Sequence, residues 1–138
     1  MQDNSYNSLE KKLKENSLTC ASVLEKYLTE LENDTNGIPF ESLKETYYIY
    51  SCKLISALES CELVALEASR QIISSDAAND REAVADFEKL LDRYILMRKT
   101  VEEYLTDTET YLSNAGEKFP RLNIMRCAEI TLRKIVIL

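Results

Sequence analysis

This chain can turn at very few places, and that limits its fold more than any other feature. Its 138 residues include only two glycines, Gly37 and Gly116, and two prolines, Pro39 and Pro120. Sheet proteins need many tight turns, which these two residue types usually supply. We therefore predict an all-α protein, with a few long helices in a single domain that spans residues 1–138.

Two central segments carry apolar residues in alternating steps of four and three, the pattern of helices that pack along one face. We expect helices over about 39–74 and about 80–114. Asn79 and Glu82 resemble a capping box at the start of the second helix, and Gly116 is expected to supply the left-handed residue at its end. The apolar positions are Leu43, Tyr47, Tyr50, Leu54, Ala57, Cys61, Val64 or Ala65, Ala68 and Ile72, then Phe87, Leu90, Tyr94, Met97, Val101, Tyr104, Thr108 and Tyr111.

These two helices can pair as a long antiparallel hairpin that resembles a coiled coil. If facing residue numbers add to about 155, small residues near the turn meet large ones, as in Ala68 against Phe87. Such pairs fill space at the density of a protein interior, and the hairpin would be roughly 50 Å long. One alternative stays open, because residues 74–80 contain neither glycine nor proline. The two segments could instead form one continuous helix in a domain-swapped or coiled-coil dimer.

Two further helices complete the predicted elongated bundle. An N-terminal helix is expected over about 8–33, after a flexible start at 1–7, and residues 33–39 hold the turn formers that reverse the chain. A short C-terminal helix is expected over about 120–136. Its predicted apolar side consists of Leu122, Met125, Ala128, Leu132 and Ile135 or Val136.

Charge is distributed unevenly between an acidic body and a basic tail. The net charge is −7, and residues 117–138 carry five basic and two acidic side chains, so their +3 leaves −10 on residues 1–116. We expect the basic, apolar segment 117–138 to pack on the bundle or on a partner. Nucleic acid is not an expected partner, because phosphate backbones favour clustered Lys and Arg.

Neither catalysis nor cofactor binding is expected. The chain has no histidine, which is the commonest general base and metal ligand. Its two glycines lie in separate turns and cannot form a phosphate-binding loop. The four cysteines, at positions 20, 52, 61 and 127, lack the close paired spacing of metal or redox motifs. We therefore expect no enzyme, no metal or other cofactor, and no small-molecule substrate.

The polar N-terminus does not resemble a secretory signal, and no run of residues has the length and apolarity of a membrane span. We accordingly expect an intracellular protein, cytoplasmic or nuclear, without stable insertion into a membrane.

Candidate partner-binding residues fall into three groups. Tyrosines at the end of the hairpin farthest from its turn could form a contact surface, or a cluster in the core that is exposed to water at one end. An acidic run could steer a basic partner, or be a solvated face. The tail is the third group. The residues are Tyr47, Tyr50, Tyr104 and Tyr111; Glu102, Glu103 and Asp107; and Arg126, Leu132, Arg133 and Ile135.

These features predict a non-catalytic subunit of a multiprotein assembly, of the kind found in cytoskeletal, kinetochore or tethering complexes. Its partners would be other helical proteins, in a homo-oligomer or a hetero-oligomer. The alternative is a self-contained helical bundle that serves as an adaptor or chaperone for one client protein.

Overall fold

The computed structural model describes residues 4–33, 39–114 and 116–138, which form four helices and no strand. The helices are α1 (Asn4–Asn33), α2 (Phe40–Ala77), α3 (Arg81–Ser113) and α4 (Pro120–Val136). The predicted all-α fold is confirmed. α1 begins four residues before the expected start at 8, and α2 ends three residues after the expected end at 74. Most of the predicted turn at 33–39 lies outside the described residues.

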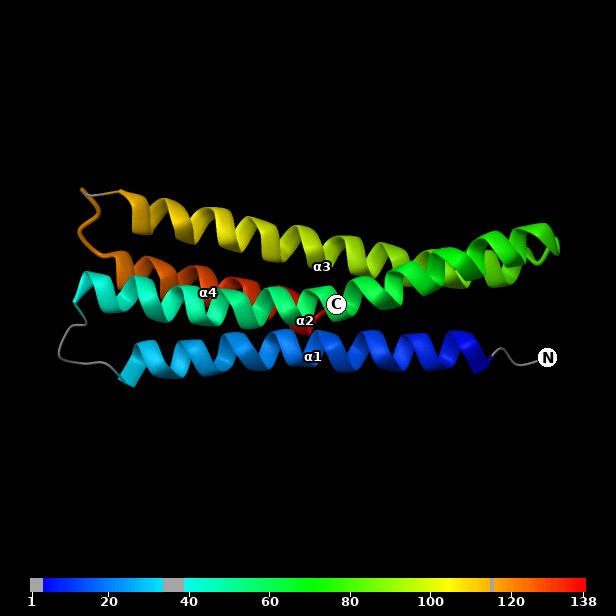
Figure 1. Ribbon diagram of the computed structural model, residues 1–138, viewed down its shortest axis with the longest axis horizontal. Coiled ribbons are helices and arrows are strands. Elements are labelled where there is room, and N and C mark those ends of the chain that lie inside the picture. Colours follow the sequence, from blue (N-terminus) through cyan, green and yellow to red (C-terminus); the bar gives the residue numbers. More distant parts are fainter. Residues whose placement is uncertain (1–3, 34–38, 115) are drawn as a thin grey trace.

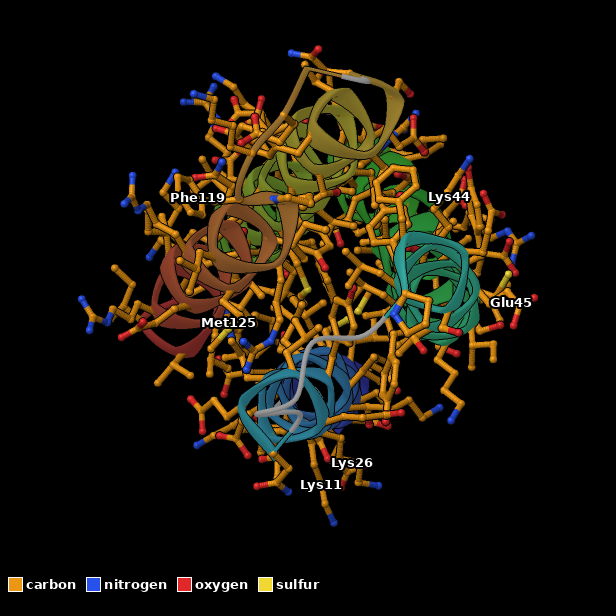
Figure 2. All side chains as sticks on the ribbon, turned by 90° about the vertical axis from the view of Figure 1, so that its left-hand side faces the viewer. Lys11, Lys26, Lys44, Glu45, Phe119 and Met125 are labelled. Carbon is orange, nitrogen blue, oxygen red and sulfur yellow. The ribbon has the colours of Figure 1, made fainter. Side chains whose placement is uncertain are left out.

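The helices run alternately up and down around one core (Figure 1). α1 and α3 each pack mainly against α2 and α4, so the helices follow one another around the core in chain order (Figure 2). Charged side chains such as Lys11, Lys26 and Glu45 point away from that core. α4 has 17 residues against 38 in α2, and it ends midway along the bundle. The half of the bundle that holds the turn between α2 and α3 is therefore built from α1, α2 and α3 alone.

A tight reversal centred on Asn79 joins α2 to α3. Asn79 has a φ of 58°, a left-handed conformation that asparagine tolerates better than most residues. Its N–H donates to the carbonyl oxygen of Asp76 at 3.0 Å, and the N–H of Asp80 donates to that of Ser75 at 2.9 Å. These two bonds form the Schellman pattern that ends many helices.

Asp80 begins the next helix. Its carboxylate oxygen Oδ1 accepts a hydrogen bond from the N–H of Ala83 at 3.1 Å, which caps α3. The predicted capping box at Asn79 is therefore wrong by one residue, since Asn79 ends α2. At the other end of α3, Asn114 is extended, and its Oδ1 accepts from the N–H of Gly116 at 2.9 Å.

This reversal closes α2 and α3 into an antiparallel hairpin within one chain, rather than one continuous helix. Two side-chain contacts report the alignment of the hairpin. Thr108 Oγ1 lies 2.7 Å from Tyr47 Oη, and the two numbers add to the expected 155. Cys61 Sγ lies 3.8 Å from Met97 Sδ, a pair that adds to 158 and so lies within one helical turn of that register. Coiled-coil packing along the whole length of the contact between α2 and α3 stays a prediction.

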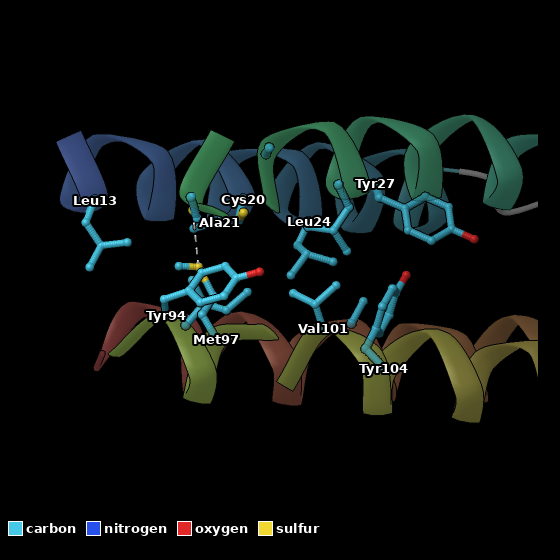
Figure 3. Close-up of a cluster of buried hydrophobic side chains, with 14 of the residues drawn as sticks. Leu13, Cys20, Ala21, Leu24, Tyr27, Tyr94, Met97, Val101 and Tyr104 are labelled. Atoms are coloured by element: carbon cyan, nitrogen blue, oxygen red, sulfur yellow. Dashed lines mark hydrogen bonds between the residues drawn. The ribbon is translucent and has the colours of Figure 1, made fainter. Parts of the chain in front are cut away.

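The core runs through all four helices, and Leu24 and Val101 point toward one another inside it (Figure 3). α2 and α3 bury most of the positions that the sequence predicts. Ser51 and Leu112 are buried in addition. Tyr50, Ile72 and Tyr111 are only half-buried.

On α4, the predicted apolar side is confirmed in part. Ala128 and Ile135 are buried, and Met125 and Leu132 are partly buried against the core. Leu122 and Val136 are 55% and 60% exposed. Arg121 Nε donates to the carbonyl oxygen of Leu31 at 2.8 Å, which satisfies one of the free carbonyls at the end of α1 and fixes the rotation of α4. Ile124 and Thr131 are buried in addition to the predicted Ala128 and Ile135. The tail thus packs on its own bundle and still leaves apolar side chains on its outer face.

The burial of Leu54 gives a first prediction for stability. Leu54 is 0% exposed, so Leu54→Ala should cost about 2–5 kcal/mol through lost transfer energy and the cavity left behind. Glu103 is exposed, and Glu103→Ala should cost less than about 0.5 kcal/mol. Urea unfolding measures both changes. Equal losses in the two variants would contradict the assignment of the inner and outer faces.

The left-handed Asn79 gives a second prediction. Asn79→Ala should lower the free energy of unfolding by about 1 kcal/mol, because alanine is strained at positive φ. Asn79→Gly is the matched control and should stay within about 0.5 kcal/mol of the original chain, because glycine adopts this conformation freely. A chain that loses as much stability with glycine as with alanine would show that the Asn79 side chain, and not its backbone conformation, holds the turn.

Candidate partner-binding surfaces

Three of the four cysteines are at least partly buried. The Cys20 and Cys61 thiols are fully buried. A hydrogen bond with Cys61, together with burial, raises the pKa of the Cys20 thiol, and burial raises the pKa of Cys127. Cys20 and Cys127 are therefore protonated at neutral pH, and a protonated thiol is a poor nucleophile and a poor metal ligand.

Among residues 4–33, 39–114 and 116–138, no three His, Cys, Asp or Glu side chains converge as a metal site requires. No helix in these ranges is long and apolar enough to cross a bilayer. An open groove of about 670 Å³ runs between α1 and α2, with Lys12 and Asn16 on one side and Leu63 on the other.

Four tyrosines gather where α1, α2 and α3 meet, at the end of the hairpin far from its turn. The rings of Tyr27 and Tyr50 are stacked with centroids 4.8 Å apart, and the Tyr47 ring is tilted against Tyr27 at 6.5 Å. Tyr104 points its hydroxyl toward Tyr27 from α3 (Figure 3). Tyr27, Tyr47 and Tyr104 are buried, and only Tyr50 is partly exposed. The cluster is therefore part of the core.

The hydroxyl groups of this cluster are unequally satisfied. Thr108 Oγ1 donates to the Tyr47 hydroxyl oxygen at 2.7 Å, and that hydroxyl donates to the Leu105 carbonyl oxygen at 3.3 Å. The Tyr27 hydroxyl has no hydrogen-bond partner among the described residues. Burial raises the pKa of both Tyr27 and Tyr104. Tyrosines in the unfolded chain ionise at about pH 10. Because the folded state holds these protons more tightly, it should lose stability as the pH rises past that value.

The predicted partner-binding residues do not form one surface. The buried ones are Tyr47, Tyr104 and Ile135. The half-buried ones are Tyr50, Tyr111 and Leu132. The exposed ones are Glu102, Glu103, Asp107, Arg126 and Arg133. Partner contact through the three buried residues stays a prediction, and it would require the bundle to open.

The exposed charged residues of that set differ in their partners. Arg98 Nε donates to Glu102 Oε1 at 2.8 Å, four residues along the same helix, and Arg133 pairs in the same way with Glu129. Exposed pairs of this kind contribute little to stability. Glu103 and Asp107 form no ion pair with another described residue. The acidic run is thus a solvated face whose charge is available to a partner.

A second set of apolar side chains, which sequence analysis missed, is exposed on the surface. Its only sequence signal is that α2 carries apolar residues outside its predicted seam. Most of the set lies on α2 and around α4. The members there are Phe40, Tyr48, Ile49, Ile55, Leu63, Leu66 and Ile73, and Phe119, Leu122, Ile130, Val136 and Ile137. Neither group contributes to the core, so both are candidates for contact with another molecule.

Comparison of the chain with models of protein families, with curated proteins and with solved structures found no match.

The unequal hydroxyls of the tyrosine cluster give a third prediction. Tyr27→Phe should leave stability unchanged or raise it by up to about 1 kcal/mol, because it removes a buried hydroxyl without a protein partner. Thr108→Val should cost about 1 kcal/mol, because it removes the donor to Tyr47. Thermal or urea unfolding measures both changes. A larger loss from Tyr27→Phe than from Thr108→Val would mean that the Tyr27 hydroxyl is bonded after all, for example to a buried water.

Proposed function

We propose that this chain is a non-catalytic subunit of a multiprotein assembly that binds other helical proteins along the outer faces of its bundle. One observation carries the proposal, namely the line of exposed apolar side chains on α2 that the core of the bundle does not use. Single exposed hydrophobic residues are normal, whereas a set aligned on one face of a helix is the pattern by which helices recognise one another. Cytoskeletal, kinetochore and tethering complexes contain long helical hairpins of this kind, which is a likeness of architecture alone.

The chemistry of the chain supports a role without catalysis or a cofactor. It has no histidine to act as a general base or metal ligand, and the Cys20 and Cys127 thiols are held protonated. Its net charge of −7 disfavours nucleic acid as a partner. All four cysteines are free, which suits the reducing interior of a cell, so we place the protein in the cytoplasm or nucleus.

A self-contained adaptor or chaperone for one client protein is the second candidate. The closed hairpin and the packing of α4 on α1 and α3 favour it, because a chain that covers its own core needs no partner subunit in order to fold. Under this candidate, the chain alone is a stable monomer and the client occupies the exposed apolar residues.

Purification of the tagged full-length chain from its native cells, followed by mass spectrometry, tests the proposal. A subunit should recover several proteins in constant proportion, whereas an adaptor should recover one client. Chromatography with light scattering on the chain alone separates the two candidates further, since an adaptor stays monomeric and a subunit associates or aggregates. Recovery of no partner in constant proportion, or turnover of a substrate that is lost on mutation of one carboxylate, would contradict both.

The tail provides the fourth prediction. Truncation after Gly116 removes α4 and uncovers the surfaces of α1 and α3 on which Ile124 and Ile135 are buried. The truncated chain should melt at a lower temperature or change its oligomeric state, because newly exposed apolar surface must be covered. Light scattering and thermal unfolding measure these effects. Unchanged mass and melting temperature would mean that the tail is dispensable for the bundle and is free to bind a partner.

A further inference from the structure

Four large apolar side chains stand in one line on the outer surface of α2. They are Tyr48, Ile55, Leu66 and Ile73, separated by steps of 7, 11 and 7 residues. At 3.6 residues per turn, these steps are close to two, three and two full turns, so all four side chains point in nearly the same direction. They are 52%, 40%, 49% and 72% exposed. We call this line the α2 stripe.

α3 extends the α2 stripe at its widest interval. Ile95 is 56% exposed, and the hairpin register places it opposite position 60, between Ile55 and Leu66. The surroundings of Tyr94 agree with that placement, because the charge of Glu62 raises and that of Arg98 lowers its pKa, after the larger effect of burial. The α2 stripe and Ile95 together form what we call the α2–α3 face.

The α2–α3 face carries mostly negative charge around Ile55 and Leu66, and Arg70, four residues after Leu66, is paired with Glu67. Arg98 is paired with Glu102. The remaining exposed carboxylates around this face form no ion pair with another described residue. They are Glu59 and Glu62 on α2, and Glu88 and Glu109 on α3. An apolar line with carboxylates on both sides is complementary to an apolar line with lysines or arginines on both sides.

From this geometry, we infer that the α2–α3 face binds a basic amphipathic helix of a partner protein, packed lengthwise against the hairpin. The inference rests on the proposed function and names the partner's chemistry. The α2 stripe spans 25 residues, roughly 38 Å along the helix, which a partner helix of similar length matches. Helices recognise such surfaces through apolar residues on one face, three and four positions apart.

A second copy of this chain is disfavoured as the occupant of the α2–α3 face. If two copies met by this face around a two-fold axis, the same patch would be used twice. Glu59 and Glu62 of one copy would then approach carboxylates of the other, and like charges in register weaken a helical pair. A basic partner turns the same charges into attraction.

A designed peptide pair tests the inference. One fluorescent peptide of about 25 residues has leucines along one helical face and lysines on both flanks, and the other has glutamates in place of the lysines. Anisotropy titration with the full-length chain should show one site for the lysine peptide and none for the glutamate peptide. The affinity should fall at high salt, because exposed charges are screened. Equal binding of the two peptides would overturn the inference.

Two pairs of variants locate the site. Ile55→Ser with Leu66→Ser should weaken binding about tenfold or more, because two apolar contacts are lost. Leu122→Ser with Ile130→Ser removes similarly exposed side chains from α4 and should leave the affinity unchanged. Likewise, Glu59→Lys with Glu62→Lys should abolish binding, whereas Glu25→Lys with Glu32→Lys on α1 should change it little. Binding that is unaffected by the α2 variants contradicts the inference.

The remaining outcomes separate this inference from the proposed function. A dimer of the original chain that dissociates in the Ile55→Ser, Leu66→Ser variant would show that a second copy occupies the face, and would overturn the inference. If the lysine peptide fails to bind while proteins purified with the chain cross-link to α4, the proposed function stands and this inference fails. If the peptide fails and no protein purifies with the chain, both fail.

Discussion

The packing of α2 against α3 determines where the other two helices can lie. The chain reverses at Asn79 within a few residues, so the two longest helices must run side by side from the turn onward. Ala65 and Ala68 of α2 and Phe87 and Leu90 of α3 are all buried near that turn. α1 and α4 then fill the remaining sides of this hairpin, and neither needs to contact the turn. The half of the bundle near the turn is complete with three helices, which is why α4 can be short.

The parts of the fold that could be predicted from sequence are those with one apolar face per helix. On α3 the residues at alternating steps of three and four are buried from Phe87 to Thr108, as predicted. α4 has apolar residues on every side, so spacing alone could not say which side is buried, and the bond from Arg121 to Leu31 decides it. The turn was ambiguous for a similar reason. Asparagine can end a helix in a left-handed conformation or cap the next one, and only the backbone bonds show which role Asn79 has.

The candidate site was less predictable than the fold, because the same residue types serve cores and interfaces. Tyrosine is favoured at interfaces, yet Tyr47 and Tyr104 are buried within their own bundle. Tyr50 is half-buried, and a hydrogen bond with Glu30 together with partial burial raises its pKa. The sequence contained a clue to the exposed residues, since Tyr48, Ile55, Leu66 and Ile73 follow a helical spacing. That clue carries meaning only once the structure shows which of two apolar lines the bundle uses.

The existence of two apolar lines on one helix is the strongest reason to look for a partner. The buried seam from Leu43 to Ala68 and the α2 stripe from Tyr48 to Ile73 are offset by five residues at both ends. Five residues make about 1.4 turns, so the two lines stay roughly 0.4 of a turn apart. α1 and α3 cover the first line, whereas the second faces outward. Serine or lysine at Ile55 and Leu66 would serve the helix and the core equally well, so the fold does not explain these side chains. The proposed contact with another molecule would explain them, and the unpaired carboxylates beside them favour a partner of positive charge.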